Sequence, residues 1–385
     1  MITPIGNDLA ANEVALRAGK CGVGRVPDFV EHKLSCEVGG LVQGPLETEL
    51  IDRKKLRFCP PVGVMSVIAA QEAFAEAGLP LEELRERRIA IIGGVAGSNY
   101  IEVFNEADKY IRTDYRLRNV SPYSVPRVMP SSAISNLSLI FGITGESYDI
   151  SAACASSALS ILVGTRLIRS GQYDIVLAGG AEQIDWVQAL GFCACRALSH
   201  KYNETPERAS RPFDRDRDGF VLAAGAAYVV LESERSCRAR GVRPISEISG
   251  IAANSNAHDM VVPDAAASAA VMRDAIADAG LSAADIGYVN THGTGTPVGD
   301  PVELDAIRRV LGDKAAINST KSQTGHMVGA TGAAEVIFTS LMLERHFLSP
   351  SINLENPDPE FGWADLVREC RTGTNAAIVI SDCGR

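Results

Sequence analysis

Cys154 is the residue whose setting in this chain most favours chemistry. Small residues surround it in the stretch Ser-Ala-Ala-Cys-Ala-Ser-Ser-Ala at 151–158, after an extended, partly apolar run. Apolar residues follow at helical spacing, so the pattern predicts a strand, a tight turn and a buried helix, with the cysteine at the turn. The free N–H groups and the dipole of a helix N-terminus favour a thiolate, the nucleophilic form of cysteine. Taken alone, the segment fits a buried structural cysteine at least as well.

Two histidines in glycine-rich segments could act with this cysteine. His292 stands in Asn-Thr-His-Gly-Thr-Gly-Thr-Pro at 290–297, and His326 in Thr-Gly-His-Met-Val-Gly at 324–329. Each segment follows a predicted strand, at the end where the sites of α/β proteins usually lie. A lone histidine has many roles and is often structural. A cysteine at a helix start with two such histidines instead indicates a nucleophile and two imidazoles that stabilise charge or move protons.

Composition and charge exclude several classes of function. The 385 residues are 46% hydrophobic and carry a net charge of −10, which argues against nucleic acid as a partner. The nine cysteines include no CxxC pair, as is usual in a reducing compartment. We find no leader and no long apolar run, so we expect a cytoplasmic protein without membrane contact. Asp214, Asp216 and Asp218 imitate the opening of a calcium loop, but Gly225 occupies the position of its essential Glu, so we expect no metal.

The chain alternates between predicted strands and helices. This order indicates an α/β fold with largely parallel sheets covered by helices. A highly charged stretch at 232–240 separates two halves of similar order, and we place the boundary at 242, giving halves 1–242 and 243–385. Residues 99–125 are polar and aromatic and are expected to run over one face of the first half. Strands are predicted at 88–94, 174–180, 220–232, 245–252, 286–290, 315–318 and 376–380, and also from 148 up to the Cys154 turn. Helices are predicted at 8–18, 62–78, 264–279, 301–311 and 329–345, and a further helix, capped by 130–136, is expected to end at 141.

A basic cluster stands out in this acidic protein. It comprises Arg53, Lys54, Lys55 and Arg57. Such a local patch can steer an acidic partner even when the whole protein is acidic. A solvated helix end explains the same residues as well.

Four stretches together resemble one family, the β-ketoacyl-acyl-carrier-protein synthases, which are condensing enzymes of the thiolase superfamily. They are DISAACASSA at 149–158, ALSHKYNETPERASRPFDRDRDGFV at 197–221, THGTGTPVGD at 291–300 and KSQTGHMVGATGAAE at 321–335. The resemblance covers nearly the whole chain and is closest to the elongating branch. The priming branch carries Asn in place of the second histidine and thiolases carry a second cysteine, so His326 separates the chain from both.

The resemblance implies a five-layered αβαβα fold built from two pseudo-duplicated halves, with the cysteine in the first and both histidines in the second. Cys154 would take an acyl group from an acyl-carrier thioester. Malonyl carrier would then lose CO2, and the resulting carbanion would attack the acyl cysteine. His292 and His326 would stabilise the enolate oxygen as hydrogen-bond donors. Lys321 and Glu335 match a charged pair that positions the second histidine, although a structural salt bridge explains them equally well.

Other matching positions concern binding. Thr294 and Thr296 match residues that hydrogen-bond the phosphopantetheine arm, with turn hydroxyls as the alternative. Asp300 matches a structural acid, which helix N-capping also explains. The basic cluster at 53–57 would dock the acidic acyl carrier protein. The resemblance implies no bound cofactor, because phosphopantetheine arrives on the carrier, and it implies a homodimer or a heterodimer with a homologous chain-length factor.

Both ends of the chain depart from the family pattern. The chain begins within the turn that usually follows a first strand, and 381–385 falls on the start of a loop that usually holds two phenylalanines. Cys383 and Arg385 would replace those phenylalanines, and the Arg385 backbone would be the second oxyanion donor. A rival alignment places 371–375 on this loop, but it leaves no strand before the loop. With both ends altered in this way, two central strands of the family fold would be absent, either because end residues are missing or because the protein is divergent.

Several functional alternatives stay open at this stage. One is the ketosynthase subunit of a specialised type II polyketide or polyene pathway that needs a chain-length factor, and the altered loop is compatible with it. The others are a non-catalytic partner subunit and a thiolase acting on coenzyme A esters. Chain length and saturation depend on a pocket that we expect to be formed by packing among residues near 100–140 and by the altered loop.

Overall fold

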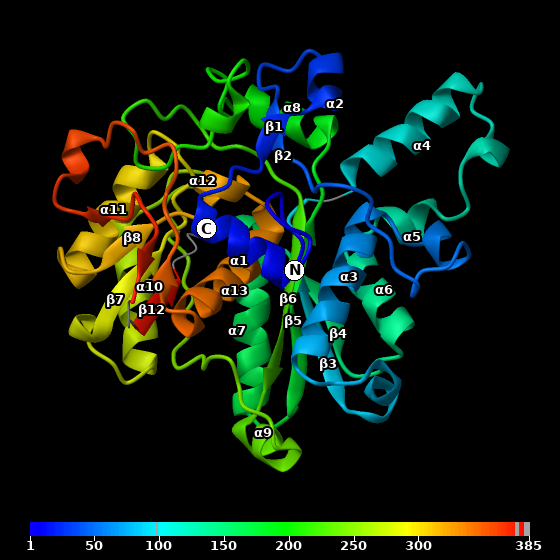
Figure 1. Ribbon diagram of the computed structural model, residues 1–385. Helices are drawn as coiled ribbons and strands as arrows, with labels where there is room; N and C mark the ends of the chain where they lie inside the picture. The colour runs from blue at the N-terminus through cyan, green and yellow to red at the C-terminus, as the bar shows by residue number, and fades with distance from the viewer. Residues whose placement is uncertain (98, 374–376, 381–385) are drawn as a thin grey trace.

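Two four-stranded sheets form the framework of the computed structural model, which describes residues 1–97, 99–373 and 377–380 (Figure 1). The first sheet has the order β4-β3-β5-β6, with β3 at Ile89–Gly94, β4 at Ser147–Ile150, β5 at Ile175–Glu182 and β6 at Gly225–Glu232. Strand β3 pairs in parallel with β4 and β5, whereas β6 runs antiparallel to β5.

The second sheet is parallel throughout. Its order is β10-β8-β7-β12, with β7 at Ile286–Asn290, β8 at Ala316–Asn318, β10 at Asp365–Leu366 and β12 at Ala377–Ile380. The prediction of an α/β fold with largely parallel sheets is therefore confirmed. Two small antiparallel pairs complete the described strands, β1 at Val23–Arg25 with β2 at Val38–Gly40, and β9 at Phe347–Leu348 with β11 at Arg371–Thr372.

Helices α7 (Ser156–Arg169) and α13 (Thr331–Glu344) form the middle layer between the sheets (Figure 1). Helix α7 packs on β3 and β5, and α13 contacts α7, β5, β6 and also β12 of the second sheet. The two helices approach closely at Gly332, where a Cβ atom would lie 2.9 Å from the backbone nitrogen of Ala158. A glycine is therefore required at this crossing, because any side chain would push the helices apart.

Further helices cover the outer faces and complete five layers. On the first sheet, α3 (Pro61–Glu76) contacts β6 and α6 (Ser132–Phe141) contacts β3. Helices α10 (Ala265–Asp278) and α11 (Gly299–Leu311) pack together and share a hydrophobic core with the second sheet. The remaining described α-helices are α1 (Leu9–Ala18), α2 (Pro27–Glu31), α4 (Tyr100–Arg112), α5 (Ser124–Val128), α8 (Trp186–Ala194), α9 (Glu234–Arg240) and α12 (Lys321–Thr324).

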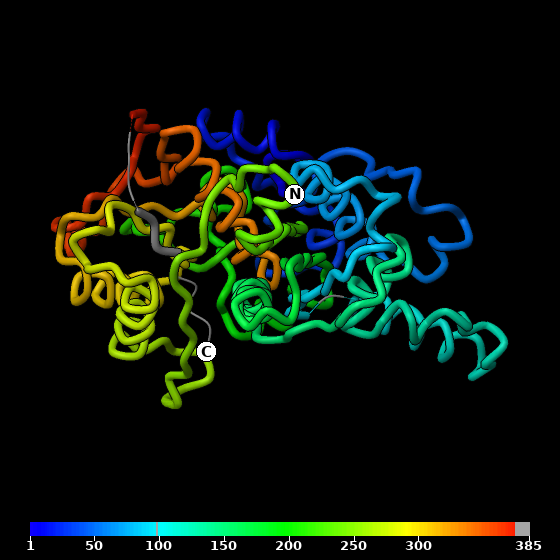
Figure 2. Tube along the Cα trace, turned by 90° about the horizontal axis from the view of Figure 1, so that it is seen from below, coloured from blue at the N-terminus to red at the C-terminus, as the bar shows by residue number. Residues whose placement is uncertain are grey.

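Residues 99–125 do not lie over a face as predicted. They form helix α4 and its return to α5, and this arm stands away from the body of the protein (Figure 2). The pattern could not show this, because polar and aromatic residues suit a segment that lies on a face as well as one that stands away from it. Several aromatic and aliphatic residues of the arm are exposed, including Ile111 at 57% and Tyr115 at 63%.

The predicted strand at 245–252 is wrong. This segment is extended but pairs with no strand in the described parts of the chain, and Ile245 is exposed. Side chains form hydrogen bonds with its backbone instead. The Ile251 N–H donates to Asp278 Oδ2 at 2.8 Å, and the Ser249 carbonyl accepts from Arg169 at 2.7 Å. The predicted strand at 220–232 also begins later, because only residues from Gly225 onward enter the β6 ladder.

Asp149 places an uncompensated carboxyl group inside the first half. Neither of its oxygens is accessible or has a hydrogen-bond partner among the described residues. A Cβ at Gly93 would lie 2.2 Å from its Oδ1, so the opposing strand must supply a glycine. Burial raises the pKa of Asp149 to about 7.

We predict that this carboxyl makes the protein less stable as the pH rises. Between about pH 4, the pKa of an unfolded Asp, and pH 7, the unfolded chain releases a proton that the folded chain retains, so stability falls by about 1.4 kcal/mol per pH unit. Asp149→Asn should flatten this slope and raise the denaturation midpoint at pH 8 in urea titrations. Asp174→Asn is the control, because hydrogen bonds from Ser233 and Arg235 lower the pKa of Asp174, so this change should not raise the midpoint at pH 8. Equal slopes for the parent and Asp149→Asn would contradict the prediction.

Candidate active site

The turn between β4 and α7 presents Cys154 at the start of the helix. Ala153, directly before it, has a φ of +49°, a left-handed conformation that is unusual for a residue with a side chain. The hydroxyl of Ser156 fixes this turn, since it accepts from Ala152 N at 2.9 Å and donates to the Ala153 carbonyl at 2.7 Å. The prediction of a strand, a turn and a helix around this cysteine is confirmed.

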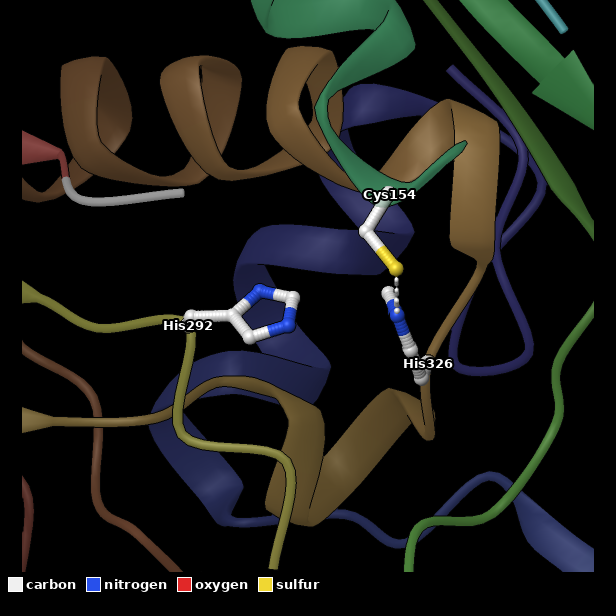
Figure 3. A group of neighbouring side chains, drawn as sticks. All are labelled: Cys154, His292 and His326. Carbon is white, nitrogen blue, oxygen red and sulfur yellow. Dashed lines mark hydrogen bonds between the residues drawn. The ribbon is translucent and has the colours of Figure 1, made fainter. Parts of the chain in front are cut away.

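His326 lies directly against the cysteine (Figure 3). Its Nε2 is 3.0 Å from Cys154 Sγ, and its Nδ1 is 3.0 Å from the Thr331 hydroxyl. Its backbone is held by the segment before β6, because His326 N donates to Val221 O at 2.7 Å and Ala223 N donates to His326 O at 2.9 Å. The ring is thus fixed at both nitrogens and at its backbone.

His292 completes the group from the opposite side (Figure 3). Its ring is perpendicular to that of His326, with the centroids 5.2 Å apart. Sγ of Cys154 and one nitrogen of each histidine all lie within 4.8 Å of one another. The buried carboxylate of Glu303 holds the loop, since it accepts from His292 N at 2.7 Å and from Gly293 N at 2.8 Å.

The site keeps His326 neutral. Burial, and then the nearby His292 and Lys321, hold the pKa of His326 well below its usual value. A neutral imidazole can donate a hydrogen bond from one nitrogen while accepting one at the other. Lys321 and Glu335 lie alongside as a buried ion pair, each 1% exposed, with Nζ 2.5 Å from Oε1.

Thr294 and Thr296 lie in the loop that follows His292. Their hydroxyls are 3.2 Å apart, and Thr296 also accepts from Gly299 N at 3.1 Å. Asp300 does not cap its own helix. Its Oδ2 accepts from Phe213 N at 2.8 Å and its Oδ1 from Gly295 N at 3.0 Å, so it ties two loops together, and burial raises its pKa to about 6.

The basic cluster lies in and just before a single helical turn at Lys55–Arg57. Arg53, Lys54 and Arg57 are exposed, and the Arg57 guanidinium lies 6.0 Å from the ring centroid of Tyr123, beside α5. Lys55 is engaged locally, because its Nζ donates to the Leu50 carbonyl at 2.8 Å.

The altered loop cannot be placed, since Cys383 and Arg385 lie outside the described residues. The strand predicted at 376–380 is present as β12, which pairs with β7. Arg371–Thr372 forms β11 and pairs with β9. The rival alignment had assigned 371–375 to the loop.

The three central side chains also offer a sulfur and two nitrogens, which is a zinc-like donor set. The same donors suit a nucleophile with two imidazoles.

Sequence reasoning missed the residues that orient the site. Ser156, Thr331 and Glu303 act through single hydrogen bonds to the turn, to the His326 ring and to the His292 loop. Thr331 and Ser156 stand within the stretches that carried the resemblance, but nothing in their spacing signalled a contact. Glu303 offered a faint signal, as an acidic residue that shares the buried face of α11 with Asp300 and with apolar residues.

The comparisons with known proteins agree with one another. The family models described as "Beta-ketoacyl synthase, N-terminal domain" and "Beta-ketoacyl synthase, C-terminal domain" match residues 1–236 and 245–355. A 3-oxoacyl-[acyl-carrier-protein] synthase 1 of Haemophilus influenzae is 40% identical over 385 residues, covering 99% of this chain and 93% of the relative.

Solved structures show the same likeness. A beta-ketoacyl synthase from Burkholderia phymatum superimposes with a TM-score of 0.90 at 33% identity, covering 96% of this chain and 91% of the other. A type II polyketide ketosynthase in complex with its acyl-carrier protein, AntDE:AntF, superimposes with a TM-score of 0.85 at 26% identity over 96% of this chain and 91% of the other.

We predict that the buried ion pair matters for stability as a unit. Lys321→Met should lower the free energy of unfolding by about 3–5 kcal/mol, because a carboxylate would lose its countercharge in the interior. The double variant Lys321→Met/Glu335→Leu should lose less than Lys321→Met alone. Urea denaturation monitored by circular dichroism measures the free energy of unfolding of both variants. A double variant that loses as much as Lys321→Met alone, or more, would contradict the coupling.

Proposed function

We propose a mechanism from one premise, that the chain belongs to the β-ketoacyl synthase family. Its fold is thiolase-like, and it is a condensing enzyme of the acyltransferase class. It catalyses decarboxylative Claisen condensation of an enzyme-bound acyl group with malonyl carrier protein, giving β-ketoacyl carrier protein. The contact of 3.0 Å between Cys154 Sγ and His326 Nε2 is the observation on which our assignment of roles depends.

In the first step, Cys154 is the nucleophile. Its sulfur attacks the thioester carbonyl of acyl carrier protein, an S–C bond forms, and the carrier thiol leaves with the proton that the cysteine thiol gives up. The start of α7 favours the attacking thiolate through its dipole. The Cys154 backbone N–H is our candidate donor to the oxyanion of this step.

In the second step, the two imidazoles serve decarboxylation. The C–C bond of the malonyl group breaks, CO2 leaves, and the electron pair forms an enolate whose oxygen accepts from His292 and His326. The carbanion then attacks the acyl-cysteine carbonyl, so a C–C bond forms, the C–S bond breaks and the thiolate returns. A neutral His326 suits this role, and donation from the Thr331 hydroxyl to Nδ1 would leave its proton on Nε2.

The surrounding residues receive supporting roles. We assign Lys321 and Glu335 to positioning and to the field around His326, and Thr294 and Thr296 to the phosphopantetheine arm. Asp300 keeps the loop that carries the two threonines in place. We also assign 1–242 to a half that supplies the nucleophile and 243–385 to a half that supplies the imidazoles.

The partners follow from the substrates. A related ketosynthase is seen with its acyl-carrier protein, and we assign the basic cluster of Arg53, Lys54, Lys55 and Arg57 to docking such a carrier. We propose a dimer with a second copy or with a homologous chain. We place the enzyme in the cytoplasm, where its described cysteines would remain the free thiols that the structure shows. No helix in the described chain has the length and apolarity needed to cross a membrane.

The acyl-enzyme gives the most direct test of the proposed mechanism. Incubation with a medium-chain acyl carrier protein should raise the intact mass by one acyl group, and Cys154→Ala should show no gain. Malonyl carrier protein should then clear the adduct. Cys195→Ala is the matched control, since this cysteine is exposed and lies outside the site. If the folded parent protein gains no mass, the assignment of Cys154 as the nucleophile is wrong.

His326→Ala should separate the two steps. Decarboxylation and condensation should slow by about 10²–10³-fold, because one donor to the enolate oxygen is lost, while acylation of Cys154 persists. Release of labelled CO2 from malonyl carrier protein measures the effect. Thr331→Val should give a smaller loss in the same step, because it removes only the group that orients the ring. Equal loss of acylation and decarboxylation would contradict the division of roles.

A further inference from the structure

Cys154, His292 and His326 converge as metal ligands do, although no short motif brings them together. Sγ of Cys154 and one nitrogen of each histidine all lie within 4.8 Å of one another, and Sγ is 3.0 Å from Nε2 of His326 (Figure 3). Zinc lies about 2.3 Å from a thiolate and about 2.0–2.1 Å from an imidazole, so tetrahedral ligands stand about 3.3–3.6 Å apart. Side-chain movements of about 1.5 Å or less therefore complete the geometry.

The burial of the three residues leaves one side of the group open. His326 is 2% exposed and forms its floor, whereas Cys154 and His292 are half-buried and keep contact with solvent. Three protein ligands with one open position are the arrangement of catalytic zinc sites, where water takes the fourth position. The ion pair of Lys321 and Glu335 beside the group carries no net charge.

Thr331 supplies the support that a ligating histidine needs. Its hydroxyl is 3.0 Å from Nδ1 of His326, and a hydroxyl can accept a hydrogen bond as well as donate one. With the ring proton on Nδ1 and bonded to Thr331, the lone pair of Nε2 faces the cation, as in most metal-bound histidines. With the proton on Nε2, the same ring is the donor of the proposed mechanism. The position of one proton therefore decides between the two uses of the ring.

We propose that Zn²⁺ binds Cys154, His292 and His326 and reversibly blocks the enzyme. The cation takes the thiolate of Cys154, whose proton passes to solvent, and nothing is oxidised or reduced. Harder cations such as Mg²⁺ prefer oxygen ligands, and these three side chains offer none. An acyl group and a cation on the same sulfur exclude each other. The binding stands on the geometry alone, whereas the block of condensation rests on the proposed function.

Equilibrium dialysis against buffered Zn²⁺, with the bound metal counted by mass spectrometry, measures the binding. We expect one tightly bound Zn²⁺ per chain, and Cys154→Ala or His292→Ala should raise its dissociation constant at least about 100-fold. Thr331→Val should raise it about tenfold, because only the support of one ligand is lost. Cys195→Ala is the control. This thiol is exposed and lies outside the group, so the variant should bind Zn²⁺ as the parent does.

Protection of the thiol gives a second readout in the parent protein, free of any folding defect of a variant. Zn²⁺ should slow the alkylation of Cys154 by iodoacetamide at least about tenfold, EDTA should restore the rate, and Mg²⁺ at the same concentration should have no effect.

Retention of the tight Zn²⁺ by Cys154→Ala, or equal protection by Mg²⁺, would overturn the inference. Unchanged acylation of Cys154 in the presence of bound Zn²⁺ would overturn it as well. If the parent instead binds Zn²⁺ through the three residues but never takes an acyl group from acyl carrier protein, the proposed function is wrong and the metal site stands.

Discussion

The packing of α7 against α13 is the contact on which the site depends. Both helices begin at the site, one directly after Cys154 and the other shortly after His326. Gly332 lets their backbones approach, and Ala333 N donates to the Ser157 hydroxyl at 3.0 Å, which links the two helix starts. Two positive helix ends therefore meet where the proposed mechanism places a thiolate and later an enolate. In that mechanism, small residues at this crossing serve the chemistry as well as the packing.

Burial gives the hydrogen bonds of this centre their strength. His326 lies in an interior from which water is largely excluded, and it makes a T-shaped contact with the Phe220 ring at 5.5 Å between centroids. In such surroundings a donor fixed in advance stabilises developing charge better than water, because no solvent must reorganise during the reaction. The same burial obliges Lys321 to keep its partner Glu335, since an unpaired charge there would be costly.

The sequence predicted the three central residues because each stands among small or glycine residues in a stretch that resembles a motif of the family. Positions set by tertiary contact were not predictable. Residues 245–252 have the composition of a strand, but composition cannot say whether a neighbouring edge is available. Asn99 is by its type a good helix cap, and only the folded backbone shows that its amide is not used as one. Thr331 and Ser156 are common small residues whose roles exist only once the turn and the imidazole lie beside them.

The contact between Cys154 and His326 joins residues 172 positions apart in the chain. During synthesis at about 5–20 residues per second, the cysteine leaves the ribosome on the order of ten to thirty seconds before its imidazole. The first sheet and α7 can assemble in that interval, but the reactive thiol has neither the ring of His326 nor the helix dipole of α13 beside it. Under the proposed mechanism, catalytic competence is therefore acquired late, when the second sheet closes over the middle layer. A nascent chain stalled before α13 would hold a folded cysteine turn with no condensing activity.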